Sequence, residues 1–346
     1  MRRCALGAVA GAVIAALSAP SVVAAPRCTE RHWVGVWSAP PTNAPRGTGL
    51  GDRMDGSLND KTATRNDTTR AILTPTHGGS TLRVRLSNRF GDKAVTFGRV
   101  TVARRETGAA LVPGTARELR FRGRRTVTVP AGRDVVSDAV RLRFGAFEAL
   151  AVDVFVPGDA GKPTEHFSAR QTSYLTPDGT GDRTAEVSGS SFTERTTGRP
   201  FVTGIDVRAP AGMGAVVALG DSLTDGYDGS PIGVPESKDG IDADGRYTDA
   251  LARRLLAARR PLAVLNMGIT GNHVLRDGAG AFGRSALKRL RADVLRQAGV
   301  TTVIWAEGLN DIGQRPSAGV RELIAGWRRG ITRMRRAGLR VLLATL

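Results

Sequence analysis

Apolar and polar residues mainly alternate from about Trp33 to Asp206. In residues 81–87 three apolar side chains alternate with two arginines, and residues 140–144 and 150–156 repeat the pattern. A period of two is typical of half-buried antiparallel strands, and clusters of Gly, Pro, Asn and Asp separate these segments as turns would. We therefore predict an all-β domain, a sandwich or jelly-roll-like fold, over residues 26–210.

The pattern changes after Pro210 to continuous apolar runs, which are typical of parallel strands buried on both faces. Apolar positions at helical spacing lie between the runs, most clearly over residues 320–334, and also over 247–255 and 287–294. Alternating strands and helices predict a parallel-sheet α/β domain over residues 211–346, with ligands beyond the carboxyl ends of the strands. The runs are residues 215–219, 262–265, 302–306 and 339–343.

Residues suited to acyl transfer follow the first three of these runs. A serine directly after a buried strand stands where a nucleophile would, a glycine lets backbone N–H groups approach a ligand, and a carboxamide adds a donor. The N–H groups of Ser222 and Gly268 and the Asn310 side chain would together form an oxyanion hole. The three loops hold Gly220, Asp221 and Ser222, then Gly268, and then Gly308, Asn310 and Asp311.

These three blocks, in this order, resemble the SGNH, or GDSL, hydrolase superfamily, and residues 220–223 are Gly-Asp-Ser-Leu. The resemblance implies a flavodoxin-like three-layer domain, Ser222 as nucleophile, Gly268 and Asn310 as oxyanion donors, and no cofactor. It also implies a carboxylic ester substrate, either acetyl groups on plant polysaccharide or lipids. Residues 33–37 and 86–91 resemble the β-rich module of secreted esterases of the xylan-esterase-like branch.

The family's fourth block, Asp-x-x-His, supplies the base and its orienting acid, and it is missing after the last apolar run. The four histidines, His32, His77, His166 and His273, all precede Asn310. A serine without a base is a weak nucleophile, so we expect a C-terminally truncated hydrolase that is nearly inactive as this chain. His273 is the one histidine with a path to Ser222, and we interpret it as a packing or surface residue. The other three are interpreted as structural or solvated.

The start of the chain predicts secretion. Residues 1–3 are basic at two of three positions, residues 5–17 are apolar, and residues 23–25 are small, which together indicate a signal peptide over 1–25. No later stretch is long and apolar enough to predict a membrane span. Once the signal is removed, Cys28 is the only cysteine left, so no intrachain disulfide is expected.

The amino-acid composition bears on which kinds of partner this chain is expected to bind. The 346 residues include 50 Lys and Arg against 32 Asp and Glu, a net charge of +18, and the hydrophobic share of 41% excludes a wholly disordered chain. Most of the cations are arginines, and those of the β-rich half lie mostly on the polar faces of predicted strands, where they face water, so nucleic acid is not an expected partner. The arginine usage suggests coding bias as much as a polyanion partner.

The sequence also contains a possible metal-binding pattern and allows functions other than ester hydrolysis. Residues 239–245 alternate acids with glycine as a calcium loop does, but the distal glutamate is absent, so we predict an acidic turn and no metal site. The alternative function is a non-catalytic exported protein that binds carbohydrate or cell wall, with a vestigial hydrolase half. Adhesion to polyanions through the arginines is a third possibility. Acyl specificity and oligomeric state are left open.

Overall fold

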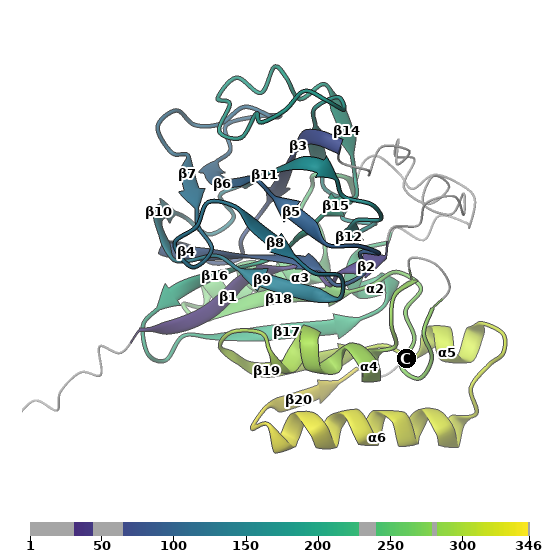
Figure 1. Ribbon diagram of the computed structural model, residues 1–346. Coiled ribbons are helices and arrows are strands. Elements are labelled where there is room, and N and C mark those ends of the chain that lie inside the picture. The colour runs from purple at the N-terminus through teal and green to yellow at the C-terminus, as the bar shows by residue number, and fades with distance from the viewer. Residues whose placement is uncertain (1–30, 44–64, 228–239, 279–281, 345–346) are drawn as a thin grey trace, which may run out of the picture.

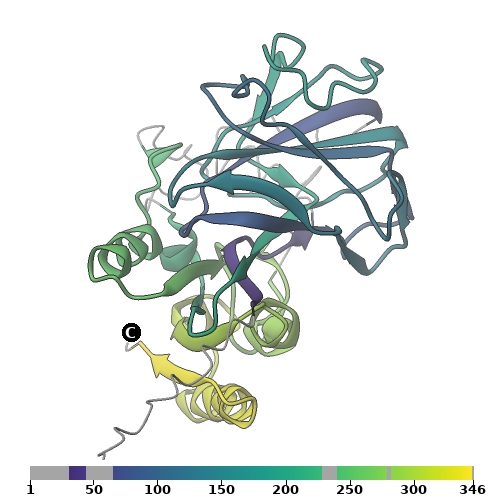
Figure 2. The ribbon, with the colours of Figure 1, turned by 90° about the vertical axis from the view of Figure 1, so that its left-hand side faces the viewer.

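The computed structural model describes residues 31–43, 65–227, 240–278 and 282–344 (Figure 1). In two views at right angles, antiparallel strands make up one half of the molecule, and a parallel sheet with its helices makes up the other (Figure 2). The predicted fold class, a β-rich region followed by an α/β domain, is confirmed. The predicted signal peptide and Cys28 lie outside the described residues, and the domain boundary at 210 stays a prediction.

Two antiparallel sheets pack face to face through their alternating apolar side chains. The predicted strands are confirmed as β4 (Gly79–Asn88), β10 (Val140–Phe144) and β11 (Leu150–Asp159). Leu82 of β4 and Val152 of β11 belong to one buried cluster, because every second residue of each strand faces the same core. The first sheet runs β1 (His32–Ser38), β16 (Val202–Ala209), β4 and β10, with β9 (Arg133–Val136) also paired to β4. The second runs β14 (Glu194–Thr196), β13 (Ser173–Leu175), β3 (Arg65–Leu73), β11, β6 (Arg99–Arg104) and β7 (Arg117–Leu119).

Two small sheets complete the β-rich region. They join β15 (Arg199–Pro200) to β12 (Thr164–His166) and β2 (Thr42–Asn43), and β5 (Val95–Phe97) to β8 (Val127–Val129).

The second half is a parallel sheet in the order β18, β17, β19, β20, as the apolar runs predict. Gly220 lies opposite Gly268 on one side and Ala306 on the other, so the three candidate loops leave the sheet side by side. The strands are β17 (Gly214–Gly220), β18 (Leu262–Gly268), β19 (Val300–Ala306) and β20 (Arg340–Leu343). The helices are α2 (Ser222–Asp225), α3 (Tyr247–Ala257), α4 (Ala286–Leu290), the π-helical turn η4 (Arg291–Leu295), α5 (Leu309–Gly313) and α6 (Val320–Arg336).

Two details differ from the sequence prediction. β20 was expected to be buried on both faces, but Leu342 and Leu343 are exposed, because among the described strands β20 pairs with β19 alone and forms a sheet edge. The helix predicted over 287–294 changes from α to π geometry, with the Arg296 N–H reaching back five residues to Arg291 O at 3.0 Å.

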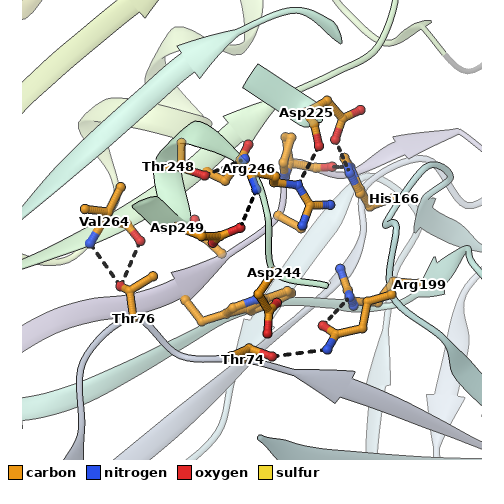
Figure 3. Close-up of a pocket in the computed structure, with 16 residues that line it drawn as sticks. Thr74, Thr76, His166, Arg199, Asp225, Asp244, Arg246, Thr248, Asp249 and Val264 are labelled. Carbon is orange, nitrogen blue, oxygen red and sulfur yellow. Dashed lines mark hydrogen bonds and ion pairs between the residues drawn. The ribbon is translucent and has the colours of Figure 1, made fainter. Parts of the chain in front are cut away.

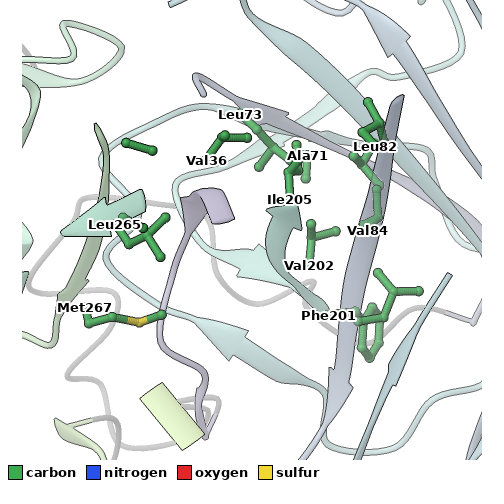
Figure 4. Packing of buried hydrophobic residues seen from close by; sticks show 14 of the residues in the cluster. Val36, Ala71, Leu73, Leu82, Val84, Phe201, Val202, Ile205, Leu265 and Met267 are labelled. Carbon is green, nitrogen blue, oxygen red and sulfur yellow. The ribbon is translucent and has the colours of Figure 1, made fainter. Parts of the chain in front are cut away.

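The sandwich and the parallel sheet share one hydrophobic core, and β1 lies between them. Val36 of β1 packs in the same cluster as Leu265 and Met267 of β18 (Figure 4). Leu265 occupies the space that a Cβ on Gly35 would need, which explains glycine at this position. The Gly35 N–H also donates to Ala298 O at 2.9 Å, so β1 is bonded to the α/β half through its backbone.

Thr76 joins the two halves at the edge of the parallel sheet. Its hydroxyl lies 3.0 Å from both Val36 O and Val264 O, and it accepts the Val264 N–H at 3.0 Å. Among the described strands β18 pairs only with β17, so its other edge has no neighbouring strand. The Thr76 hydroxyl takes the place of a strand there by contacting both the N–H and the carbonyl of Val264.

We predict that Thr76→Val lowers the free energy of unfolding by about 1–3 kcal/mol, because it keeps the shape but leaves buried backbone groups unpaired. Urea denaturation followed by fluorescence measures the change. Thr96→Val is the matched control, since the Thr96 hydroxyl bonds only to the exposed Thr128 hydroxyl at 2.9 Å. Equal stability of the Thr76 and Thr96 variants would contradict the proposed link.

Candidate active site

Ser222 is the first residue of α2, directly beyond the carboxyl end of β17. The Asp221 side chain caps the helix by accepting the Leu223 N–H at 3.2 Å. Asp221 O accepts the N–H groups of Thr224 and Asp225, whereas the Ser222 N–H belongs to the first turn and has no acceptor within the helix. The half-buried Ser222 therefore presents both its hydroxyl and its N–H at the end of the strand.

Gly220 and Gly268 allow α2 to lie tightly against the ends of β17 and β18. A Cβ on Gly220 would overlap the Thr224 side chain, and a Cβ on Gly268 would overlap the backbone N of Asp225. The Gly268 N–H already donates to Asn266 Oδ1 at 2.8 Å. Gly268 thus has a packing role here, and its predicted role as an oxyanion donor stays a prediction that its engaged N–H does not favour.

Asn310 connects the second and third loops. Its Nδ2 donates to Asn272 O at 2.8 Å, and its Oδ1 accepts from Gln314 Nε2 at 2.8 Å. One N–H of the Asn310 carboxamide is thereby used, and the other is left. Gly271, next to Asn272, has a φ of 75°, and its N–H has no hydrogen-bond partner among the described residues.

Asp311 holds the third loop against the second. Its carboxylate accepts the backbone N–H groups of Val274 at 2.8 Å and Leu275 at 3.1 Å. Gly308 precedes α5 with a φ of 138°, a conformation that L side chains rarely adopt. The Gly-x-Asn-Asp block is therefore explained residue by residue, with Gly308 shaping the loop, Asp311 anchoring it and Asn310 facing the second loop.

A buried arginine lies beneath all three loops. Arg289 of α4 is 4% exposed and donates to Gly220 O at 2.9 Å, to Met267 O at 2.7 Å and to Asn272 Oδ1 at 2.9 Å. Its guanidinium also lies 3.6 Å from Glu307 at the end of β19. Sequence reasoning missed it, although Ala286, Arg289, Leu290 and Asp293 follow helical spacing on a buried face, which was the available signal.

Two carboxyl groups that directly follow strands of the parallel sheet, Glu307 and Asp221, have raised pKa values. Burial raises the pKa of Glu307 to about 7, despite the opposing influence of Arg289 and a hydrogen bond from Trp305 Nε1. Burial also raises the pKa of Asp221. Both carboxyl groups are buried, and each directly follows a strand of the parallel sheet.

No histidine of this chain hydrogen-bonds to Ser222 within the described residues. His273 Nε2 faces Arg276 Nη2 at 3.2 Å, and because a guanidinium only donates, this nitrogen must accept. His32 and His77 bond to the carbonyls of Met213 and Gly78, each at 3.0 Å. The interpretation of His273 as a packing residue agrees with its burial and with this contact.

His166 is not solvated but forms a buried pair with Asp225. Its Nε2 lies 2.9 Å from Asp225 Oδ1, and its Nδ1 lies 2.9 Å from Pro40 O. The second carboxylate oxygen accepts both the N–H and the hydroxyl of Thr270, at 2.8 and 2.9 Å. Both ring nitrogens face acceptor oxygens, so neither is directed at Ser222. Burial alone would raise the pKa of Asp225, but His166, then Arg246 and Thr270, outweigh it and hold that pKa below its usual range.

A small polar cavity lies beside this pair, between the sandwich and the α/β half (Figure 3). Its volume is about 40 Å³, and His166, Arg199, Asp244 and Arg246 are among its lining residues. Since one water needs roughly 10–15 Å³ by this measure, the cavity has room for a few waters but not for an ester substrate. Burial, reinforced by Arg246, lowers the pKa of Arg199 to about 9.

Two kinds of feature are absent from the described part of the chain. No group of three His, Cys, Asp or Glu side chains is placed to hold a metal ion there, and in the same residues no helix is long and apolar enough to cross a membrane. Of the acidic turn predicted over 239–245, Asp239 lies outside the described residues. The Asp242 carboxylate accepts hydrogen bonds from the Thr172 N–H and from the Thr172 hydroxyl, both at 2.7 Å.

Comparison with known proteins bears on the α/β half. Residues 218–346 match the sequence model of the GDSL-like Lipase/Acylhydrolase family. No curated protein matches the chain.

Three esterases are among the solved structures to which this chain is similar. AlinE4, an SGNH-hydrolase family esterase, is 20% identical over 39% of this chain and 60% of its own, with a TM-score of 0.30. A family two carbohydrate esterase from Clostridium thermocellum, in complex with cellohexaose, is 13% identical over 81% of this chain and 71% of its own, with a TM-score of 0.32. The M. smegmatis aryl esterase is 20% identical over 38% of this chain and 62% of its own, with a TM-score of 0.33. The matched part thus spans about 60% of AlinE4.

We predict that Asp225→Asn costs on the order of 3–5 kcal/mol at pH 7, because it leaves a buried charge without its partner. Since the pKa of Asp225 is depressed in the folded protein, the stabilisation is present above the unfolded value of about 3.9 and is lost as the pH falls through the folded pKa. Urea denaturation between pH 3 and 8, with the exposed Glu106→Gln as control, measures the difference. A gap between wild type and Asp225→Asn that is constant over this range would contradict the assignment.

Proposed function

We propose that this chain is a serine hydrolase of carboxylic esters with Ser222 as its nucleophile, on the premise that residues 218–346 match the sequence model of the GDSL-like Lipase/Acylhydrolase family. The observation that carries the proposal is the meeting of three loops at the carboxyl ends of β17, β18 and β19. That edge is where ligands bind in open parallel sheets. Ser222, Asn272 and Asn310 lie at the start of the three segments that leave it.

In the proposed reaction, Ser222 Oγ attacks the ester carbonyl carbon while a base from solution, such as added imidazole, takes the hydroxyl proton. The carbonyl π electrons move to oxygen, and the resulting oxyanion accepts hydrogen bonds. Collapse of this intermediate breaks the bond to the alcohol, which leaves with a proton, and an acyl-serine remains. Water then attacks the acyl-serine in the same way and releases the acid.

Three donors are proposed for the oxyanion. The Ser222 N–H and the unused N–H of Asn310 Nδ2 are two of them. Because the Gly268 N–H is engaged with Asn266, we propose the Gly271 N–H, in the same loop and next to Asn272, as the third. Asp221, Gly220, Gly308 and Asp311 support these groups by capping, close packing and loop anchoring.

We also propose that the chain acts outside the cell, on the pattern of residues 1–25. Its substrate class is an acyl ester, and both acetylated polysaccharide and lipid esters fit the proposal. No cofactor is required by the reaction as written.

We predict that a fluorophosphonate probe labels Ser222, because the oxyanion donors activate attack at phosphorus as they do at a carbonyl carbon. Ser222→Ala should remove the label, and the exposed Ser190→Ala should leave it unchanged. Tryptic mass spectrometry of the labelled chain identifies the site. Labelling that persists in Ser222→Ala would overturn the assignment of the nucleophile.

Addition of a base gives a second measurement on the same variants. Since no histidine contacts Ser222, added imidazole should raise the Ser222-dependent hydrolysis of p-nitrophenyl acetate above the Ser222→Ala background. The same assay on acetylated xylan and on a short lipid ester separates the two substrate classes. If the wild type neither labels nor hydrolyses any ester even with added imidazole, the result favours the alternative of a non-catalytic protein that binds carbohydrate or cell wall, which retention on insoluble xylan or cell wall tests.

A further inference from the structure

Arg289 is the one described side chain with hydrogen bonds or ion contacts to all three loops of the proposed active site. Its Nη2 reaches Gly220 O, two residues before Ser222, and its Nη1 reaches Met267 O. Its Nε reaches Asn272 Oδ1, on the residue whose carbonyl holds Asn310. The distances are 2.7–2.9 Å, so each is a full hydrogen bond.

The shape of the guanidinium group makes this arrangement rigid. Its donors lie in one plane at fixed angles, so bonds from three nitrogens define the relative positions of the groups they reach. Glu307, at the end of β19, lies 3.6 Å from Nη2 and accepts from Trp305 Nε1 at 2.9 Å, which extends the set to the third strand. Few other side chains have the reach and the number of donors to do this.

A chain of ion pairs continues from Arg289 into the sandwich. Asp293 lies one helical turn along, 3.5 Å from Arg289 Nη1, and its other oxygen lies 3.1 Å from Arg89 Nη1. Arg89 follows β4 and also bonds to Asp134 of β9 at 2.5 Å. Asp293 is 2% exposed, and Arg89 is partly buried, so the chain crosses the boundary between the two halves largely away from solvent.

We propose that Arg289 is a positioning residue for the proposed ester hydrolysis and sets the spacing of Ser222 and the oxyanion donors. Arg89 of the sandwich pairs with Asp293 and thereby helps to hold Arg289 in place. The inference rests on the proposed function for its chemistry, but its geometric content is independent of any activity. A purely structural role would lower the stability of the whole α/β half, whereas a positioning role acts on the loops.

The test uses the full chain with substitutions along the ion-pair chain. Arg289→Met removes the guanidinium group, Arg289→Lys keeps the charge but not the planar set of donors, and Asp293→Asn and Arg89→Met break the link to the sandwich. Arg333→Met is the matched control, because Arg333 also donates to a backbone carbonyl near α4, Leu287 O at 2.8 Å, but contacts none of the loops.

Hydrogen exchange is the first readout, because it needs no activity. We expect Arg289→Met to increase exchange about tenfold in residues 220–227, 266–275 and 307–313, and to leave β11 and α6 unchanged. Arg89→Met and Asp293→Asn should give a smaller increase in the same segments, and Arg333→Met none. Unchanged exchange in the loops, or an equal increase throughout the α/β half, would overturn the proposal. If Arg289→Met does not fold, hydrogen exchange in Arg89→Met and Asp293→Asn decides between the positioning role and a purely structural one.

Fluorophosphonate kinetics are the second readout and separate positioning from binding. For Arg289→Met we expect the rate constant of attack to fall on the order of a hundredfold, as it does for reacting groups misplaced by about 1 Å, with the probe's binding constant unchanged. Arg289→Lys should recover only part of this loss. Full recovery by lysine would show that charge alone suffices and would refute the role of the planar guanidinium group. If wild type is not labelled, the proposed function fails, and hydrogen exchange alone decides the positioning.

Discussion

The burial of one guanidinium group beneath the strand ends is the constraint on which the three loops of the candidate site depend. A charged group taken out of water is costly unless its donors are all met, and Arg289 meets that condition only if Gly220, Met267 and Asn272 stand at fixed places. The same bonds hold three backbone loops that no strand pairing could hold beyond the sheet. Charge burial is therefore the reason why three separate segments share one geometry.

The second constraint is the core shared by the sandwich and the parallel sheet. β1 presents Val36 to the common apolar cluster, while Gly35 admits Leu265 and Thr76 satisfies the free edge of β18. Arg89 and Asp293 add a charged connection at the other side of the same boundary. Because apolar packing and paired charges both cross it, the sandwich is a part of the structure that supports the candidate site and not an appended module.

The histidines show how position in the fold overrides residue type. His166 and His273 lie close to the candidate loops, yet His166 is committed to Asp225 and Pro40, and His273 to Arg276. A general base needs a free lone pair directed at the proton it removes, and neither ring offers one to Ser222. The strand ends that carry the candidate nucleophile and the proposed oxyanion donors lie side by side, while these histidine contacts supply no proton acceptor.

The sequence by itself determined the two fold classes, the four parallel strands and the three loops, because each depends on local periodicity or on a short block such as Gly-Asp-Ser-Leu. It also determined that Ser222 would stand at a strand end. Only the tertiary structure decided that the Gly268 N–H is engaged, that His166 pairs with a residue 59 positions away, and that Arg289 joins the loops. Such contacts depend on which strand ends lie side by side, and no spacing within a single segment encodes that.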